Sequence, residues 1–78
     1  MPKLPAMRSK DFLKRLKAFG CNEVSVNGSH HKVVNPSNGK TSHVPVHSGA
    51  DMNKGLFSAI LKQLGIDVDE FLAFIKNN

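Results

Sequence analysis

Two adjacent histidines, His30 and His31, follow a glycine and a serine at the point where the chain is expected to turn between two β-strands. The pair Asn27-Gly28 lies between two short runs that alternate apolar and polar residues, which is a strong signal for a β-hairpin. Imidazole is the side chain that most readily exchanges a proton near neutral pH. A histidine pair on a rigid strand of a small basic protein therefore predicts acid–base chemistry on an anionic polymer.

The alternation of side chains along a strand places His30 and His31 on opposite faces, so the two histidines cannot share one role. Two further histidines, His43 and His47, have the same parity if the third predicted strand extends that far. A zinc site built from them lacks a cysteine pair and the ligand spacings of structural zinc sites. The sequence therefore predicts no bound metal.

The chain has 78 residues and a formal net charge of +5, with 11 basic residues against 6 acidic ones. Within residues 1–17 the only acidic residue is Asp11, and the basic residues there are Lys3, Arg8, Lys10, Lys14, Arg15 and Lys17. A basic front half is typical of a nucleic-acid-binding surface, although a solvated helix face gives the same pattern.

The first half of the chain predicts one helix and three strands. A helix over residues 9–19 is indicated by Ser9 as N-cap, by Gly20 as the stop, and by apolar residues at helical spacing, namely Phe12, Leu13, Leu16 and Phe19. Val24 and Val26 alternate with polar residues, which predicts a half-buried strand. A second strand over 30–35, a turn at 36–39 and a third strand over 41–46 complete an antiparallel meander, with Pro45 at an edge or a strand end.

The second half predicts two helices after a loop at 48–50. Asn53 or Asp51 is expected to cap the first of them, Gly65 to end it, and its buried face to consist of Leu56, Phe57, Ile60, Leu61 and Leu64. Asp67 and Glu70 have capping-box spacing before a short final helix whose apolar residues are Phe71, Leu72, Phe74 and Ile75. We therefore expect one α+β domain over residues 1–78, with the order α-β-β-β-α, a three-stranded antiparallel sheet with helices on one face, and a short extra C-terminal helix.

The single cysteine, Cys21, excludes an intramolecular disulfide and fits a reducing compartment. It is expected to pack as a small apolar residue at the end of the first helix. No apolar run approaches the length of a membrane span, and residues 1–7 do not resemble a signal peptide. The sequence predicts a cytoplasmic protein without a membrane partner.

Lys54 and Gly55 stand at the expected start of the second long helix. A helix N-terminus offers free N–H groups and partial positive charge, so this position suits a phosphate. Close packing is an equally good reason for Gly55, and both interpretations remain open at this point.

Several motifs together resemble the HicA family of bacterial toxins, the messenger-RNA-cleaving halves of toxin–antitoxin pairs. The matching segments are the helix at 8–20, the motif Gly28-Ser29-His30-His31, the stretch 44–47 (VPVH) and the long segment 54–66. An aromatic residue often follows the paired histidines in the family, and here Val33 and Val34 take those places.

The resemblance implies a fold like that of double-stranded-RNA-binding domains, endoribonuclease activity on mRNA without a metal or other cofactor, His31 as the catalytic residue, and a HicB-type antitoxin as partner. In such a mechanism a neutral imidazole removes the proton of the substrate's 2′-hydroxyl, while Lys32 and Lys54 stabilise the charge on the phosphate. The candidate RNA-binding residues are Gly28, Ser29, His30, Lys32, His47 and Lys54.

Two other functions fit the residues. A non-catalytic RNA-binding module would use the same basic face, with His31 only contacting phosphate. A small interaction domain would carry its histidines incidentally.

Overall fold

A computed structural model of the chain describes residues 7–46 and 52–76. The elements follow the order helix, three strands, two helices: α1 (Ser9–Phe19), β1 (Asn22–Asn27), β2 (His30–Asn35), β3 (Lys40–Pro45), α2 (Lys54–Gln63) and α3 (Val68–Lys76). The strands form one antiparallel sheet in the order β1-β2-β3. The predicted α+β class, element order and meander are confirmed.

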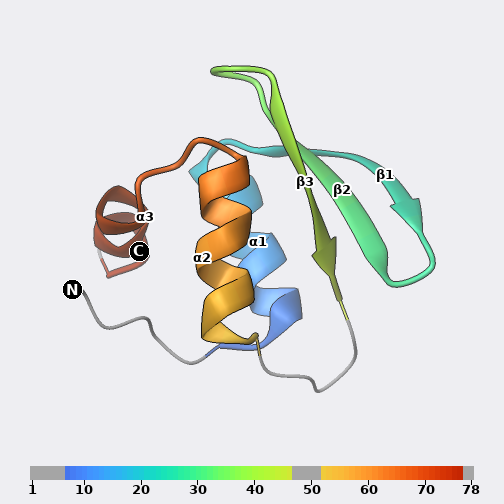
Figure 1. Cartoon of the computed structure of the whole chain (residues 1–78), viewed down its shortest axis with the longest axis horizontal. Helices are drawn as coiled ribbons and strands as arrows, with labels where there is room; N and C mark the ends of the chain where they lie inside the picture. Colours follow the sequence, from blue (N-terminus) through green and yellow to red (C-terminus); the bar gives the residue numbers. More distant parts are fainter. Residues whose placement is uncertain (1–6, 47–51, 77–78) are drawn as a thin grey trace.

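The molecule is layered, with the sheet on one side, α1 and α2 beside it, and α3 farthest away (Figure 1). Helices α1 and α2 pack against β3, whereas α3 packs against the two other helices rather than against a strand. Strand β1 is the sheet edge on the far side of β2 from β3. The helices within the described residues have at most 11 residues, which is too short to cross a membrane.

Phenylalanine rings join the three helices into one core. The ring of Phe12 in α1 lies 4.6 Å from that of Phe57 in α2 and 5.8 Å from that of Phe71 in α3. All three side chains have at most 1 % of their surface exposed. Truncation of a fully buried phenylalanine to alanine typically costs ~3–5 kcal/mol, so these rings dominate the stability of a chain this small. Cys21 is also buried in this core, as predicted.

Two details of the helices differ from the prediction. Arg8, not Ser9, is the N-cap residue of α1, and Ser9 is the first helical residue, with 3 % of its surface exposed. Leu56 is 37 % exposed rather than buried, whereas its neighbour Phe57 is 1 % exposed, so the buried face of α2 begins at Phe57.

The valines of β1 are also not where the alternating pattern put them. Val24 and Val26 are each 54 % exposed. The pairing of β1 with β2 shifts by one residue between Glu23 and Ser25, so that Val24 is the extra residue of a β-bulge. Since β1 is an edge strand and the helices pack on β3, no helix covers these valines.

The turn between β2 and β3 holds the end of α2. The side-chain amides of Asn35 and Asn38 both donate to the carbonyl oxygen of Leu64, at 2.9 and 3.0 Å. This carbonyl is one of the groups that a helix end leaves without an intrahelical partner. Gly65 follows with φ of +70°, and a Cβ atom there would lie 2.5 Å from Nδ2 of Asn38. Gly65 therefore ends α2 as predicted and also leaves room for this contact. Pro45 is the last residue of the edge strand β3, again as predicted.

We expect Gly65→Ala to destabilise the fold more than Gly39→Ala. Both glycines have positive φ, which costs an alanine ~1–2 kcal/mol, but a Cβ atom at Gly39 meets nothing within 4 Å. The difference between the free energies of unfolding of the two variants in urea measures the cost of the close contacts of this Cβ atom with Asn38 and with Cδ of Lys40, 3.2 Å away. Equal losses would show that Asn38 moves aside without cost.

Candidate active site

His31 lies on the face of the sheet that looks towards the helices. It shares this face with Val33, two residues along β2, which is fully buried. The His31 side chain is 21 % exposed, whereas His30 is exposed on the other face. The predicted separation of the two histidines is confirmed, and only His31 stands in a partly enclosed position.

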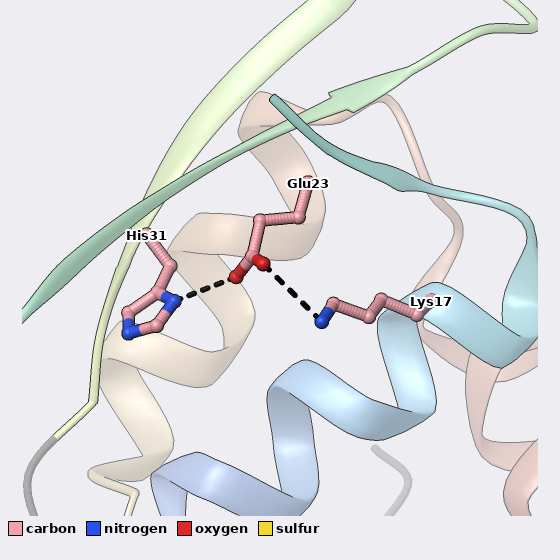
Figure 2. A network of polar contacts seen from close by, with 3 residues as sticks. All are labelled: Lys17, Glu23 and His31. Atoms are coloured by element: carbon pink, nitrogen blue, oxygen red, sulfur yellow. Dashed lines mark hydrogen bonds and ion pairs between the residues drawn. The ribbon is translucent and has the colours of Figure 1, made fainter. Parts of the chain in front are cut away.

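A carboxylate holds one nitrogen of the His31 ring. Nδ1 of His31 lies 2.6 Å from Oε2 of Glu23 on β1, and Oε1 of Glu23 lies 3.3 Å from Nζ of Lys17 on α1 (Figure 2). Glu23 thus connects the sheet to the helix layer. The other ring nitrogen, Nε2, is on the far side of the ring from Glu23, and no group in the described part of the chain hydrogen-bonds to it.

The β1 bulge is what brings Glu23 to this face. From Asn27 back to Ser25, each residue of β1 pairs with one residue of β2, and this register would set Glu23 opposite Val34 on the other face. Because Val24 is extra, Glu23 instead pairs with Val33, which is on the face of His31. Glu23 and His31 are then diagonal neighbours across the two strands, within reach of each other.

The contacts of Glu23 favour its charged form. The hydrogen bond with His31 lowers the pKa of the Glu23 carboxyl below its ordinary value, with a smaller contribution from Lys17 in the same direction. An ionised Glu23 can only accept a hydrogen bond, so the proton of this contact is on Nδ1 of the His31 ring. The neutral ring in that tautomer presents Nε2 as a free proton acceptor.

A hollow of about 360 Å³ opens in front of His31, and we call it the His31 hollow. It is lined by Lys10, Leu13, Lys14, Lys17, Glu23, His31 and Val46. Its volume is in the range of small-ligand sites. Three lysines against one carboxylate give the hollow a net positive charge, so His31 and a cationic wall line the same space.

The hairpin turn before His31 is built from Gly28 and Ser29. Gly28 has φ of +62° as the first of two loop residues, and Asn27 pairs with His30 beyond it. A glycine at this position of a two-residue hairpin is typical of a type II′ turn. The carbonyl of Ser29 accepts a hydrogen bond from the Val46 backbone, 2.7 Å away. Both residues therefore fix the start of β2, where His31 stands.

Other predicted site residues are spread over the molecule. Lys32 is next to His31 in β2 and so points to the opposite face, where it pairs in register with His43. His47 is outside the described residues. The described histidines are not part of any group of three or more potential metal ligands in residues 7–46 and 52–76.

The start of α2 is already capped by the protein itself. Oδ1 of Asn53 accepts hydrogen bonds from the N–H groups of Gly55 and Leu56, which confirms Asn53 as the cap. A Cβ atom at Gly55 would lie 3.1 Å from that oxygen. This contact supports the close-packing interpretation of Gly55. Lys54 is exposed beside this cap and does not line the His31 hollow.

Sequence reasoning missed the two partners of the histidine. Lys17 was seen only as part of a basic segment, and Glu23 only as a polar residue of an alternating strand. Regular alternation puts Glu23 on the wrong face, so only recognition of the bulge could have paired it with His31. The signal available was chemical, since Glu23 is the one acidic residue near the hairpin in the sequence.

Comparison with known proteins identifies the family of this chain. Residues 9–66 match the family model described as the HicA toxin of bacterial toxin–antitoxin systems. The chain is 40 % identical over 60 residues to the "Probable mRNA interferase HicA" of Pseudomonas fluorescens (strain Pf0-1), an alignment that covers 77 % of this chain and 97 % of that protein. This chain belongs to the HicA toxin family.

The ion pairs of Glu23 predict a specific pH dependence of stability. The carboxyl has a folded-state pKa below its ordinary 4.5, so its contribution is fully present above that pH and is lost as the pH falls through the lower folded value. We expect wild type to exceed Glu23→Gln in free energy of unfolding at neutral pH, and the difference to shrink below pH 4.5. Urea titrations over this range measure it. A constant difference would mean that the charge of Glu23 is not involved.

Proposed function

We propose that this chain is an endoribonuclease that cleaves mRNA as the toxin of a toxin–antitoxin pair, with His31 as the general base. The observation that supports it most is the contact between His31 and Glu23 at the edge of the lysine-lined hollow. It supplies an oriented base beside a cationic surface. Membership of the HicA toxin family and the name of the Pseudomonas relative give the substrate class.

In the proposed reaction, Nε2 of neutral His31 takes the proton of a ribose 2′-hydroxyl. The 2′-oxygen then forms a bond to the adjacent phosphorus and the bond from phosphorus to the 5′-oxygen breaks. The leaving 5′-oxygen takes a proton from water, a 2′,3′-cyclic phosphate remains on the other fragment, and the proton on Nε2 returns to the solvent. Glu23 keeps Nδ1 protonated and the ring in place, and it offsets the positive charge that forms on the imidazole. General-base catalysis of this kind contributes ~10²–10⁴-fold to a rate. DNA has no 2′-hydroxyl and should not be cut.

The reaction needs no metal or other cofactor in this proposal, because the nucleophile belongs to the substrate and the base to the protein. Gly28 and Ser29 set the position of His31, and His30, Lys32, His47 and Lys54 remain candidate RNA contacts outside the base itself. The proposed place of action is the cytoplasm, where mRNA is found.

His31→Ala should lower the cleavage rate of an RNA oligonucleotide by about 10²–10⁴-fold and leave most of the RNA affinity intact, with or without a chelator. His43→Ala is the matched control, because His43 is an exposed histidine that pairs in register with Lys32 on the other face of the sheet, and it should retain most of the activity.

Equal activity of wild type and His31→Ala would contradict the mechanism. RNA binding by wild type without any cleavage would favour a non-catalytic RNA-binding module. Activity lost with chelator and restored by a divalent ion would replace the metal-free mechanism.

The proposed antitoxin is a HicB-type protein that covers the His31 hollow. A basic surface beside the base favours a partner with complementary acidic charge, and such complementarity also speeds association. We expect this antitoxin and RNA to compete for the toxin, and the antitoxin to raise the apparent melting temperature because it binds the folded state. Fluorescence competition titrations test the geometry. Simultaneous binding without mutual weakening would show that inhibition does not work by occlusion.

A further inference from the structure

The wall of the His31 hollow that α1 supplies is a row of lysines. Lys10, Lys14 and Lys17 follow each other at intervals of four and three residues, so they lie on one face of the helix. Lys10 and Lys14 are a full helical turn apart, a rise of ~6 Å. All three are exposed at the rim of the hollow.

The three lysines differ in what neutralises them. Lys17 is 3.3 Å from the Glu23 carboxylate. No carboxylate of residues 7–46 or 52–76 forms an ion pair with Lys10 or Lys14. Lys17 therefore acts on His31 through Glu23, whereas Lys10 and Lys14 present uncompensated positive charge to the hollow.

From this arrangement we propose that Lys10 and Lys14 bind backbone phosphates of the RNA strand that His31 acts on. The strand then runs along α1 and brings a ribose to the open Nε2 of His31. This inference rests on the proposed ribonuclease function. It assigns substrate contacts to α1, whereas the earlier candidate contacts Lys32 and Lys54 belong to β2 and α2.

A second hollow of similar size lacks the positive charge of the His31 hollow. It has about 390 Å³ and lies at the other end of α1, beside Gly20, Asn38 and Gly65. Its lining contains Glu70 and no lysine or arginine. Of the two hollows, which are close in volume, only the one that contains His31 has the charge to receive a phosphate.

The phenylalanine rings of this chain are not placed to stack RNA bases in the His31 hollow. Proteins often hold single-stranded RNA by stacking its bases on aromatic rings. This chain has five aromatic residues, all phenylalanine. Their rings contact each other in the helical core, and none lines the His31 hollow. Affinity that comes from lysines and phosphates is tolerant of base sequence and falls steeply with salt.

The test compares two double variants of equal charge. Lys10→Gln/Lys14→Gln, the hollow variant, alters the His31 hollow. Lys40→Gln/Lys62→Gln, the control variant, removes two exposed lysines outside the hollow, one at the first residue of β3 and one in the last turn of α2. The probe is a mixed-sequence 2′-O-methyl RNA oligonucleotide, which has no free 2′-hydroxyl and is not cleaved. Its affinity is measured by fluorescence anisotropy at several salt concentrations.

We expect the hollow variant to bind more weakly and to lose about 1.4 from the slope of log K against log salt, which corresponds to two contacts with a single strand. The control variant should keep the wild-type slope. Equal effects of both variants, or no effect of the first, would overturn the assignment to α1.

Cleavage of unmodified RNA separates this inference from the function on which it rests. Suppose that wild type cleaves RNA in a His31-dependent way, while the hollow variant keeps the wild-type salt dependence of binding and the wild-type KM. The phosphate assignment is then wrong and the ribonuclease proposal stands. If only the hollow variant shows a weaker salt dependence of RNA binding, but wild type never cleaves RNA, Lys10 and Lys14 bind RNA and the ribonuclease proposal is wrong.

Discussion

The contact between Glu23 and His31 depends on one extra residue in β1. Strand geometry alternates faces with a period of two, so one inserted residue reverses which side chains share a face. Val24 is that residue, and its insertion sets Glu23 on the side of His31. Bulges are frequent at sheet edges and next to active sites, where they redirect a side chain. Here the bulge lies in an edge strand, where no neighbouring strand has to follow the shift.

The rest of the fold keeps this edge in place without enclosing it. The phenylalanine core joins the three helices, and α1 and α2 meet the sheet at β3, one strand away from His31. At one end, Asn35 and Asn38 tie the β2–β3 turn to the last turn of α2. At the other end, Ser29 binds the backbone of Val46. Strand β2 is therefore fixed at both ends, and His31 near its beginning is partly open to solvent.

Local signals in the sequence were enough for the elements of the fold, but not for the register between strands. Gly20, Asn53 and Gly65 mark helix ends because caps act through neighbouring residues, and the turn at 36–39 is similarly local. His31 was located through the hairpin signal and the family motif. Glu23 was not, because its face depends on pairing across two strands, and the alternation of Val24 and Val26 indicated a regular strand. Leu56 was misplaced for a related reason: helical spacing defines an apolar face, while the neighbours of the helix decide how much of it is covered.

The lysines of α1 show how one helix can serve two tasks in a chain too small for separate layers. Lys17 reaches back to Glu23, so it helps to keep the carboxylate ionised and aimed at Nδ1. Lys14 and Lys10 lie one and two turns earlier, where β1 offers no carboxylate to neutralise them. Glu23, the only acidic residue that lines the hollow, already contacts His31 and Lys17, so it does not neutralise Lys10 or Lys14. A single carboxylate thus both holds the His31 ring and leaves the charge of Lys10 and Lys14 without a partner in the described part of the chain.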